Sequence, residues 1–141
     1  MSARIVGTWR LISFQGRNAN GDCRPALGEN AQGLLVYTAD GHMIAILSEA
    51  GRRPFNSRDV RGGTPEEALA AVNSYVSYSG RYEVDGDIVT HHVELSLFPN
   101  WVGEDQTRRL RITEDKLILN TPAFSVSGSE WTFELIWERV S

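Results

Sequence analysis

The sequence predicts an all-β fold, an eight-stranded antiparallel barrel with one helix inserted between the third and fourth strands. Apolar and polar residues alternate with a period of two along many short runs, which is typical of half-buried strands. Turn residues separate these runs, and strands do not alternate regularly with helices, so a parallel sheet is not expected. Eight mostly sequential strands avoid exposed edges by closing into a barrel.

The chain is long enough for one core. With 141 residues and 41% apolar composition, we expect a single domain over residues 1–141. Gly41 and Gly86 lie between neighbouring runs and supply the positive φ of hairpin turns. Residues 17–32 are rich in Gly, Asn and Pro without a period, so they are predicted to form a long loop. The predicted strands lie around Trp9 and over residues 34–38, 42–48, 81–84, 88–97, 106–112, 116–121 and 131–139.

The helix is predicted from its first residues. Thr64, Pro65 and Glu67 supply an N-cap hydroxyl, a first-turn proline and the glutamate of a capping box. An apolar stripe at helical spacing follows, and we expect it to pack against an apolar surface, with Gly80 ending the helix. Residues 49–63 carry four arginines without an apolar period and are interpreted as a solvated loop. The stripe consists of Ala68, Leu69, Val72, Tyr75 and Val76.

Composition argues against several classes of function. The net charge of −4 and the pI of about 5.3 do not favour a nucleic-acid partner. Cys23 is the only cysteine, and the histidine spacing fits no metal site, so we expect no disulfide and no metal. No glycine-rich phosphate loop is present, and no cofactor is expected. No run approaches the ~20 apolar residues of a membrane helix, so we expect a cytoplasmic protein without a membrane partner.

Three parts of the sequence together resemble the small lipocalin-like domain family. They are Gly7-Thr8-Trp9 with Arg139, the segment GLLVYTADGHM, and the segment HHVELSLFPNWVGEDQTR. The resemblance spans nearly the whole chain. It implies a barrel with Trp9 and Arg139 packed across its floor and a pocket for a small apolar or aromatic molecule, but neither one ligand nor one reaction. Unlike the secreted lipocalins, the chain is expected to have no signal peptide and no disulfide, and its helix is predicted between the third and fourth strands instead of after the last.

Strand parity predicts which histidine enters the barrel. His91 shares a face with the apolar residues of its strand, so we expect His91 inside and His92 outside. A one-residue bulge would reverse this, and His92 with Glu94 would then be the better acid–base pair. A lone histidine on an apolar face is either a hydrogen-bonded core residue or a catalyst. The predicted inward set is Val89, His91, Val93, Leu95 and Leu97.

Arg108 shares its face with Leu110 and Ile112, so a permanent charge would enter an apolar interior and would need a partner. That partner is an acidic ligand group, a protein carboxylate, or the ring of Trp101. Trp101, in the turn after Pro99, either anchors this connection or roofs the pocket. The other residues expected to line the ligand site are Tyr37, Tyr82, Phe133 and Trp137.

Three functions remain open at this point. The first is a barrel that binds a small hydrophobic molecule with an anionic end held by Arg108. The alternative is a cofactor-free isomerase, cyclase or hydratase acting on a polyketide- or terpenoid-like substrate, in which His91 or His92 moves a proton and Arg108 stabilises an oxyanion. The third is a solidly packed scaffold, with the outward Ile12 and Ile136 as candidates for a homodimer face.

Overall fold

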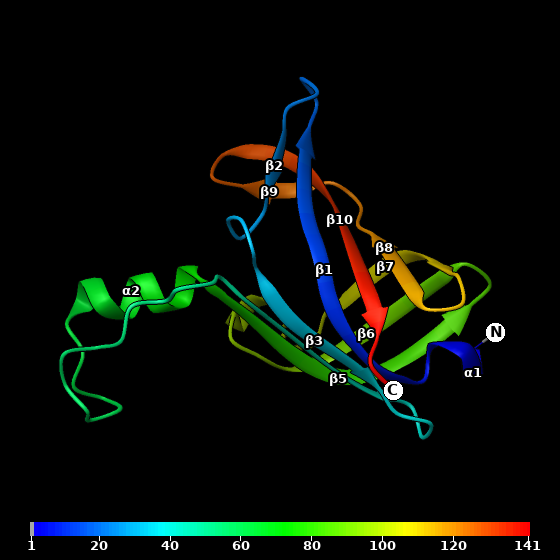
Figure 1. Ribbon diagram of the computed structural model, residues 1–141, viewed down its shortest axis with the longest axis horizontal. Coiled ribbons are helices and arrows are strands. Elements are labelled where there is room, and N and C mark those ends of the chain that lie inside the picture. The colour runs from blue at the N-terminus through cyan, green and yellow to red at the C-terminus, as the bar shows by residue number, and fades with distance from the viewer. Residues whose placement is uncertain (1) are drawn as a thin grey trace.

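The computed structural model describes residues 2–141 and shows a closed antiparallel β-barrel with a helical arm (Figure 1). The helical elements are α1 (Ser2–Ile5), α2 (Pro65–Asn73) and the short 3-10 helix η1 (Pro99–Trp101). The strands are β1 (Gly7–Asn18), β2 (Cys23–Pro25), β3 (Gln32–Tyr37), β4 (His42–Ser48), β5 (Tyr75–Asp85), β6 (Ile88–Ser96), β7 (Asp105–Ile112), β8 (Lys116–Asn120), β9 (Phe124–Val126) and β10 (Ser129–Arg139).

Eight long strands close the barrel. Sequential strands from β3 to β8 pair with their neighbours, β8 pairs with β10, and β10 pairs with β1, which in turn pairs with β3. The short strands β2 and β9 add to β1 and β10 at one end (Figure 1). The predicted all-β antiparallel barrel of eight strands is confirmed. Because the short β2 precedes β3, the inserted helix α2 lies between β4 and β5 in this numbering.

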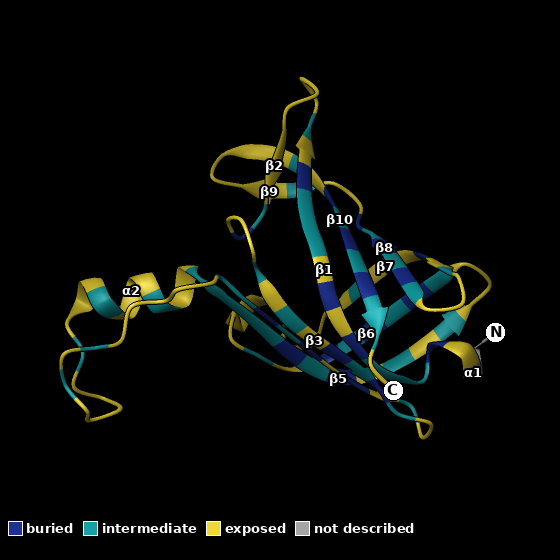
Figure 2. Cartoon of the chain, in the orientation of Figure 1, coloured by how far each residue is buried: buried dark blue, intermediate teal, exposed yellow. Residues whose placement is uncertain are grey.

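Alternation along each strand places the core inside the barrel. In β4, for example, Met43, Ala45 and Leu47 are buried, whereas Ile44 is exposed. The same alternation of buried and more exposed residues is visible on several strands in Figure 2. The largest fully buried side chains are Trp9, Trp137, Tyr37, Ile5, Leu35, Met43, Leu117, His91 and Val89.

One end of the barrel is closed by a tryptophan and an arginine, as predicted. The Arg139 guanidinium lies 4.2 Å from the centre of the Trp9 ring. The Trp9 indole N–H donates to the carbonyl of Ile5 at 2.9 Å. Arg139 donates to the carbonyl of Val6 at 3.0 Å and to the carbonyl of Arg4. This floor is therefore stacked and hydrogen-bonded without any ligand.

A β-bulge in β6 changes the parity that the sequence predicts. The pairing of β5 with β6 shifts register beside Gly80, and Glu94 is the extra residue. A Cβ at Gly80 would lie only 1.8 Å from the carbonyl oxygen of His92, so glycine is required there. Beyond the bulge the strand faces exchange, and Leu95 and Leu97 are exposed. The prediction that these two leucines point inward is wrong.

The helix begins as predicted and ends earlier. Thr64 and Glu67 form the capping box, but α2 ends at Asn73 and the chain enters β5 directly. Tyr75 and Val76 therefore belong to a strand rather than to the helical stripe, and Gly80 does not end the helix. Hydrogen bonds to β4 give this segment a strand geometry that its helical spacing did not indicate.

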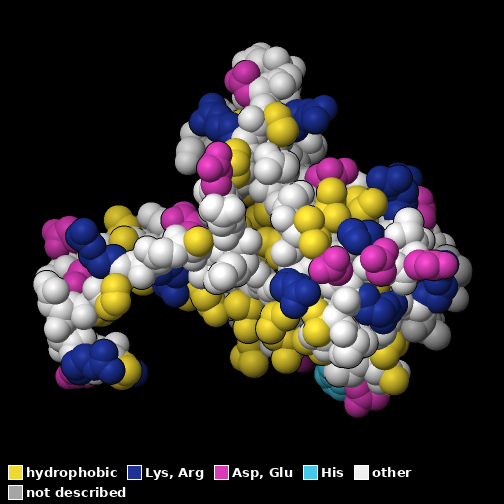
Figure 3. Space-filling model, in the orientation of Figure 1, with side chains coloured by type: hydrophobic (Ala, Val, Ile, Leu, Met, Phe, Trp, Pro, Cys, Tyr) yellow, Lys and Arg dark blue, Asp and Glu magenta, His cyan; other side chains and the backbone are white. Residues whose placement is uncertain are grey.

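The segment around α2 forms an arm that extends from the barrel (Figures 1 and 3). No residue of α2 is buried, and Leu69 and Val72 are exposed. The predicted packing of the helical stripe against an apolar surface is thus not seen within the described chain. None of the described helices has the length and apolarity needed to span a membrane.

The predicted loop over residues 17–32 is partly ordered as strand. The first strand continues to Asn18, which pairs with Trp131 of β10, and β2 pairs back onto β1. Most of this region is exposed at one end of the barrel, and backbone pairing to β1 holds β2, whereas Leu27 is buried and lines the interior.

Candidate ligand-binding site

The interior of the barrel contains a cavity of about 260 Å³. Asn73 at the end of α2 and Trp101 in η1 line it from connections at the end opposite the Trp9 floor. Its size lies close to the lower end of ligand pockets in proteins, about 300 Å³. Most of its walls are apolar, and they include Leu35, Leu47, Val76, Phe124, Phe133 and Leu135.

His91 lies inside the barrel between two tyrosine hydroxyls. The Tyr37 oxygen lies 2.6 Å from His91 Nε2, and the Tyr78 oxygen lies 2.7 Å from His91 Nδ1. The side chain is buried as strand parity predicts. Burial, and then the positive charges of Arg108 and His92, lower the pKa of His91 to about 3. The imidazole is therefore neutral at physiological pH, so one ring nitrogen donates and the other accepts.

The two tyrosines remain protonated phenols. Burial raises the pKa of Tyr37 well above its ordinary value, and the neighbouring Tyr78 raises it further, against the opposing charge of Arg108. Burial also raises the pKa of Tyr78, again opposed by Arg108. A chain of hydroxyl, imidazole and hydroxyl thus runs from the packed interior to the cavity, because Tyr78 and His91 line the cavity.

Arg108 brings a positive charge to the cavity wall. Its side chain is buried with 9% exposure, as parity predicts. Its guanidinium donates to the Thr107 carbonyl at 3.0 Å and to Gln106 Oε1 at 3.1 Å, both uncharged acceptors. Among the described residues no carboxylate forms an ion pair with Arg108. The third alternative, stacking on the ring of Trp101, is also not formed in the described chain. A buried charge without a counter-ion is unfavourable for folding.

Trp137 adds an unsatisfied hydrogen-bond donor. Its side chain is fully buried and lines the cavity. Its indole N–H has no hydrogen-bond partner within residues 2–141. Buried donors without a partner are rare in folded proteins, because the hydrogen bond to water that is lost on folding is not replaced. The cavity therefore combines an unpaired cation with an unpaired N–H.

The other predicted site residues divide into two groups. Trp101 and Phe133 line the cavity, and the Trp101 ring packs edge-on against Tyr78 with 5.7 Å between the ring centres. Tyr37 and Tyr82 do not line it among the described residues. Tyr82 packs edge-on against Tyr37 and donates to the carbonyl of Thr38 at 2.7 Å. The position of Trp101 and Phe133 supports the prediction that they contact a ligand directly, whereas the position of Tyr37 and Tyr82 does not.

His92 lies outside the barrel in a separate ionic cluster. Its Nδ1 lies 2.8 Å from Asp105 Oδ1 and its Nε2 lies 2.7 Å from Glu83 Oε1. Hydrogen bonds to Asp105 and Glu83 raise the pKa of His92. The alternative pairing of His92 with Glu94 is not formed, because Glu94 occupies the bulge. The two carboxylates bind opposite ring nitrogens, so the three groups do not converge on one point.

Tyr78 is the site residue that the sequence reasoning missed. It lies between the predicted helical stripe and Gly80, the predicted end of the helix, whereas the structure places it in β5, where it points into the barrel. The period-two run of Val76, Tyr78, Gly80 and Tyr82 could have indicated the strand.

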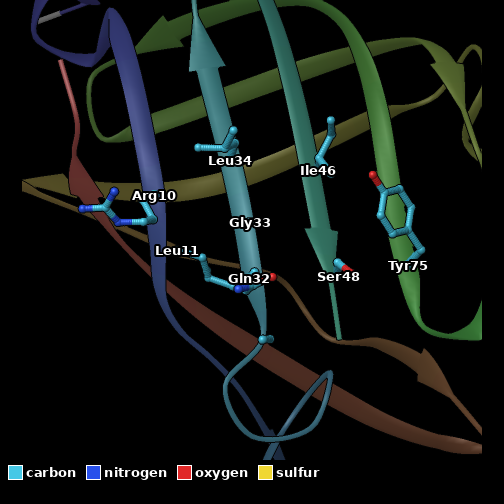
Figure 4. A pocket seen from close by; sticks show the side chains of 9 residues that line it. Arg10, Leu11, Gln32, Gly33, Leu34, Ile46, Ser48 and Tyr75 are labelled. Atoms are coloured by element: carbon cyan, nitrogen blue, oxygen red, sulfur yellow. The ribbon is translucent and has the colours of Figure 1, made fainter. Parts of the chain in front are cut away.

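A second depression lies outside the barrel (Figure 4). It has a volume of about 380 Å³ and is formed on the outer face of β1, β3, β4 and β5 by residues such as Arg10, Leu34, Ile46 and Tyr75. It is separate from the Tyr78–His91–Arg108 cavity, with which it shares no lining residue.

Comparisons with known proteins place the fold and the site in context. Over 107 residues the chain is 33% identical to the 4'-hydroxy-3'-methoxypropiophenone carrier protein ppsC of Aspergillus oryzae, a match that covers 70% of this chain and 96% of that protein. Similar solved structures include an uncharacterized protein from Bacteroides eggerthii, with 13% identity, a TM-score of 0.47, and coverage of 96% and 98% of the two chains. A mutant of the fluorescent protein UnaG is also similar, with 13% identity, a TM-score of 0.42, and coverage of 99% of each chain.

The family model for the lipocalin-like domain matches residues 6–140, which is nearly the whole chain. The match includes all eight long strands and every residue of the cavity described above. This protein therefore belongs to the lipocalin-like domain family.

Proposed function

We propose that this protein binds a small apolar or aromatic molecule inside its barrel and that Arg108 holds an oxygen-bearing, acidic end of that molecule. The observation that carries the proposal is the buried Arg108 guanidinium, which has no carboxylate partner in the described chain and lines a largely apolar cavity. The unpartnered Trp137 N–H in the same wall supports it. Apolar walls with a few placed polar groups are typical of small-molecule sites.

We further propose an aromatic ketone or phenol as the ligand class. The Aspergillus relative is named a carrier of 4'-hydroxy-3'-methoxypropiophenone, which is an aromatic ketone with a hydroxyl group. A molecule of this class offers a ring to the walls around Phe133 and Trp101 and oxygen atoms to the donors of Arg108 and Trp137. Its compact shape is compatible with a cavity of about 260 Å³.

The geometry supports binding better than isomerase, cyclase or hydratase chemistry. A general base must be free to take a proton and needs a pKa near the working pH. Both nitrogens of His91 are engaged by tyrosine hydroxyls, and its pKa is lowered to about 3. His92 lies on the outer face of the barrel, so it is not placed to act on a molecule in the cavity.

Native mass spectrometry tests the proposal with the purified protein and a mixture of aromatic ketones, phenols and apolar acids. We expect bound ligand at unchanged mass and about 10- to 100-fold weaker binding by Arg108→Leu, because a charge-assisted hydrogen bond is lost. Arg109→Leu is the matched control, since Arg109 is exposed and paired with Asp87 at 3.0 Å. Unchanged affinity in Arg108→Leu would refute the role of Arg108, and recovery of an isomer or hydrate would establish catalysis instead.

A further inference from the structure

We infer that the cavity holds its ligand as an oxyanion, a phenolate or an enolate, because Tyr78, Arg108 and Trp137 each offer it a hydrogen-bond donor and the one charged side chain of its described lining is positive. This inference rests on the proposed function, since it specifies the ionisation state of a ligand bound in that same cavity. Its basis is the direction of the hydrogen bonds that link Tyr37, His91 and Tyr78, together with the surroundings of Arg108 and Trp137.

The proton order follows from the environment of Tyr37. The Tyr37 hydroxyl is buried, and His91 Nε2 is its hydrogen-bond partner in the described structure. If Nε2 carried the ring proton, the hydroxyl proton of Tyr37 would be left buried without an acceptor, which is costly. Tyr37 therefore donates to Nε2, and the ring proton of the neutral His91 lies on Nδ1.

The consequence reaches the cavity through Tyr78. His91 Nδ1–H donates to the Tyr78 oxygen at 2.7 Å, so the hydroxyl proton of Tyr78 is free to donate elsewhere. Because Tyr78 lines the cavity, a ligand oxygen is the available acceptor for this proton. The series of hydrogen bonds from Tyr37 through His91 thus makes Tyr78 a donor toward the cavity, although an isolated tyrosine hydroxyl can also accept a hydrogen bond.

The remaining polar groups of the wall match this polarity. Arg108 has only N–H donors, and two neutral acceptors occupy part of its guanidinium. The Trp137 indole can only donate and has no partner in the described chain. Thr121 Oγ1 already accepts the backbone N–H of Phe133 at 2.9 Å, which leaves its hydroxyl proton as a further donor.

The charge balance favours an anion over a neutral acceptor. The described lining contains no carboxylate, and Asn73 at the mouth contributes only a neutral amide. A buried cation is stabilised most by an opposite charge that enters the same low-dielectric space. When a phenol binds as phenolate, its proton passes to bulk water, because both nitrogens of His91 are already engaged.

The site also allows a clear measurement, because its own groups do not titrate near neutral pH. The titratable groups that face or adjoin the cavity are Tyr37, Tyr78, Tyr82, His91 and Arg108. Burial raises the pKa of each tyrosine, lowers the pKa of His91 to about 3, and Arg108 stays charged. A protonation change observed near neutral pH therefore belongs to the ligand. His92 lies outside the cavity wall, and the variant His92→Gln tests whether its protonation contributes to the observed change.

The test uses 4-hydroxyacetophenone as the probe and its methyl ether, 4-methoxyacetophenone, as the ligand that cannot ionise. Ultraviolet absorbance distinguishes the phenol from the phenolate, so the ionisation midpoint of the bound probe can be followed with pH. Burial alone raises the pKa of a phenol, as it does for Tyr78. A bound probe would in addition accept hydrogen bonds from Tyr78 and Trp137 beside the charge of Arg108, so we expect binding to lower this midpoint by about 1–3 pH units. We also expect the methyl ether to bind more weakly by about tenfold or more.

Three variants test whether the shift arises in the cavity. Arg108→Met keeps an unbranched apolar stem but removes the guanidinium, so it should remove the shift, whereas Arg109→Met and His92→Gln should keep it. Thermal unfolding of each variant checks that it folds. If both ligands bind equally and the absorbance of the phenol is unshifted, the oxyanion inference is wrong and the proposed function stands. If neither ligand binds, both fail.

Discussion

The barrel floor and the interior cavity contain the same pair of residue types, an arginine and a tryptophan, in opposite states. At the floor, Arg139 stacks on Trp9, and both side chains donate to backbone carbonyls. In the cavity, Arg108 lacks an anionic partner and the Trp137 N–H lacks any partner within the described chain. A satisfied pair contributes to folding, whereas an unsatisfied pair costs stability that a ligand can offset. The difference in hydrogen-bond partners distinguishes the structural floor from the proposed binding site, although both contain the same residue types.

The largest expected effect is at the floor. Trp9→Ala removes a fully buried indole, and we expect the free energy of unfolding to fall by about 3–5 kcal/mol. Urea denaturation followed by far-ultraviolet circular dichroism measures this change. Trp101→Ala is the comparison, because Trp101 is only partly buried, and an equal loss in both variants would contradict the assignment of the floor as the structural end.

The two arginines should differ in the sign of their effect on stability. Arg139→Leu should lower the free energy of unfolding by about 0.5–2 kcal/mol from the lost stacking on Trp9 alone. Arg108→Leu should leave it unchanged or raise it, because a buried charge without a counter-ion is replaced by an apolar group. Denaturant unfolding without ligand tests both. A strong loss of stability in Arg108→Leu would show that its two neutral acceptors already satisfy it.

The two tryptophans allow a finer version of the same comparison. Trp9→Phe removes an N–H that donates to Ile5 and should cost about 0.5–1.5 kcal/mol beyond the loss of ring area. Trp137→Phe removes an N–H without a partner, so only the loss of ring area should count. Thermal melts of the two variants, with and without a bound phenol, measure the difference. The comparison fails if Trp137→Phe is the more destabilised of the two without ligand.

The smallest expected effect is on the outer face, where the pKa of His92 shifts in the opposite direction from that of its neighbour His91. Hydrogen bonds to Asp105 and Glu83 raise the pKa of His92, so its contribution to stability is complete below its ordinary value of about 6.5 and is lost as the pH rises through the raised pKa. We expect His92→Gln to lower Tm more at about pH 6 than at about pH 9. An equal decrease in Tm at both pH values would show that the protonated His92 imidazolium does not contribute to stability. Because the cluster is exposed, the effect should be small.

Much of the site could be predicted because it depends on strand parity. Alternation along β6 and β7 placed His91 and Arg108 inside and His92 outside before any contact was known. The same reasoning failed at Leu95, because the bulge at Glu94 depends on the pairing of two strands and on a glycine that admits a close backbone approach. Parity is a local property, and a bulge is a property of a strand pair.

The sequence by itself determined the barrel and the inward position of His91 and Arg108, since both follow from the period-two alternation of strands. It also determined the Trp9–Arg139 floor, which follows from the family resemblance. Only the tertiary structure decided that Tyr78 and Tyr37 hold His91 from both sides and that Arg108 and Trp137 remain without full partners. The physical reason is that β3, β5, β6, β7 and β10 contribute these groups, and their relative distances exist only once the barrel has closed.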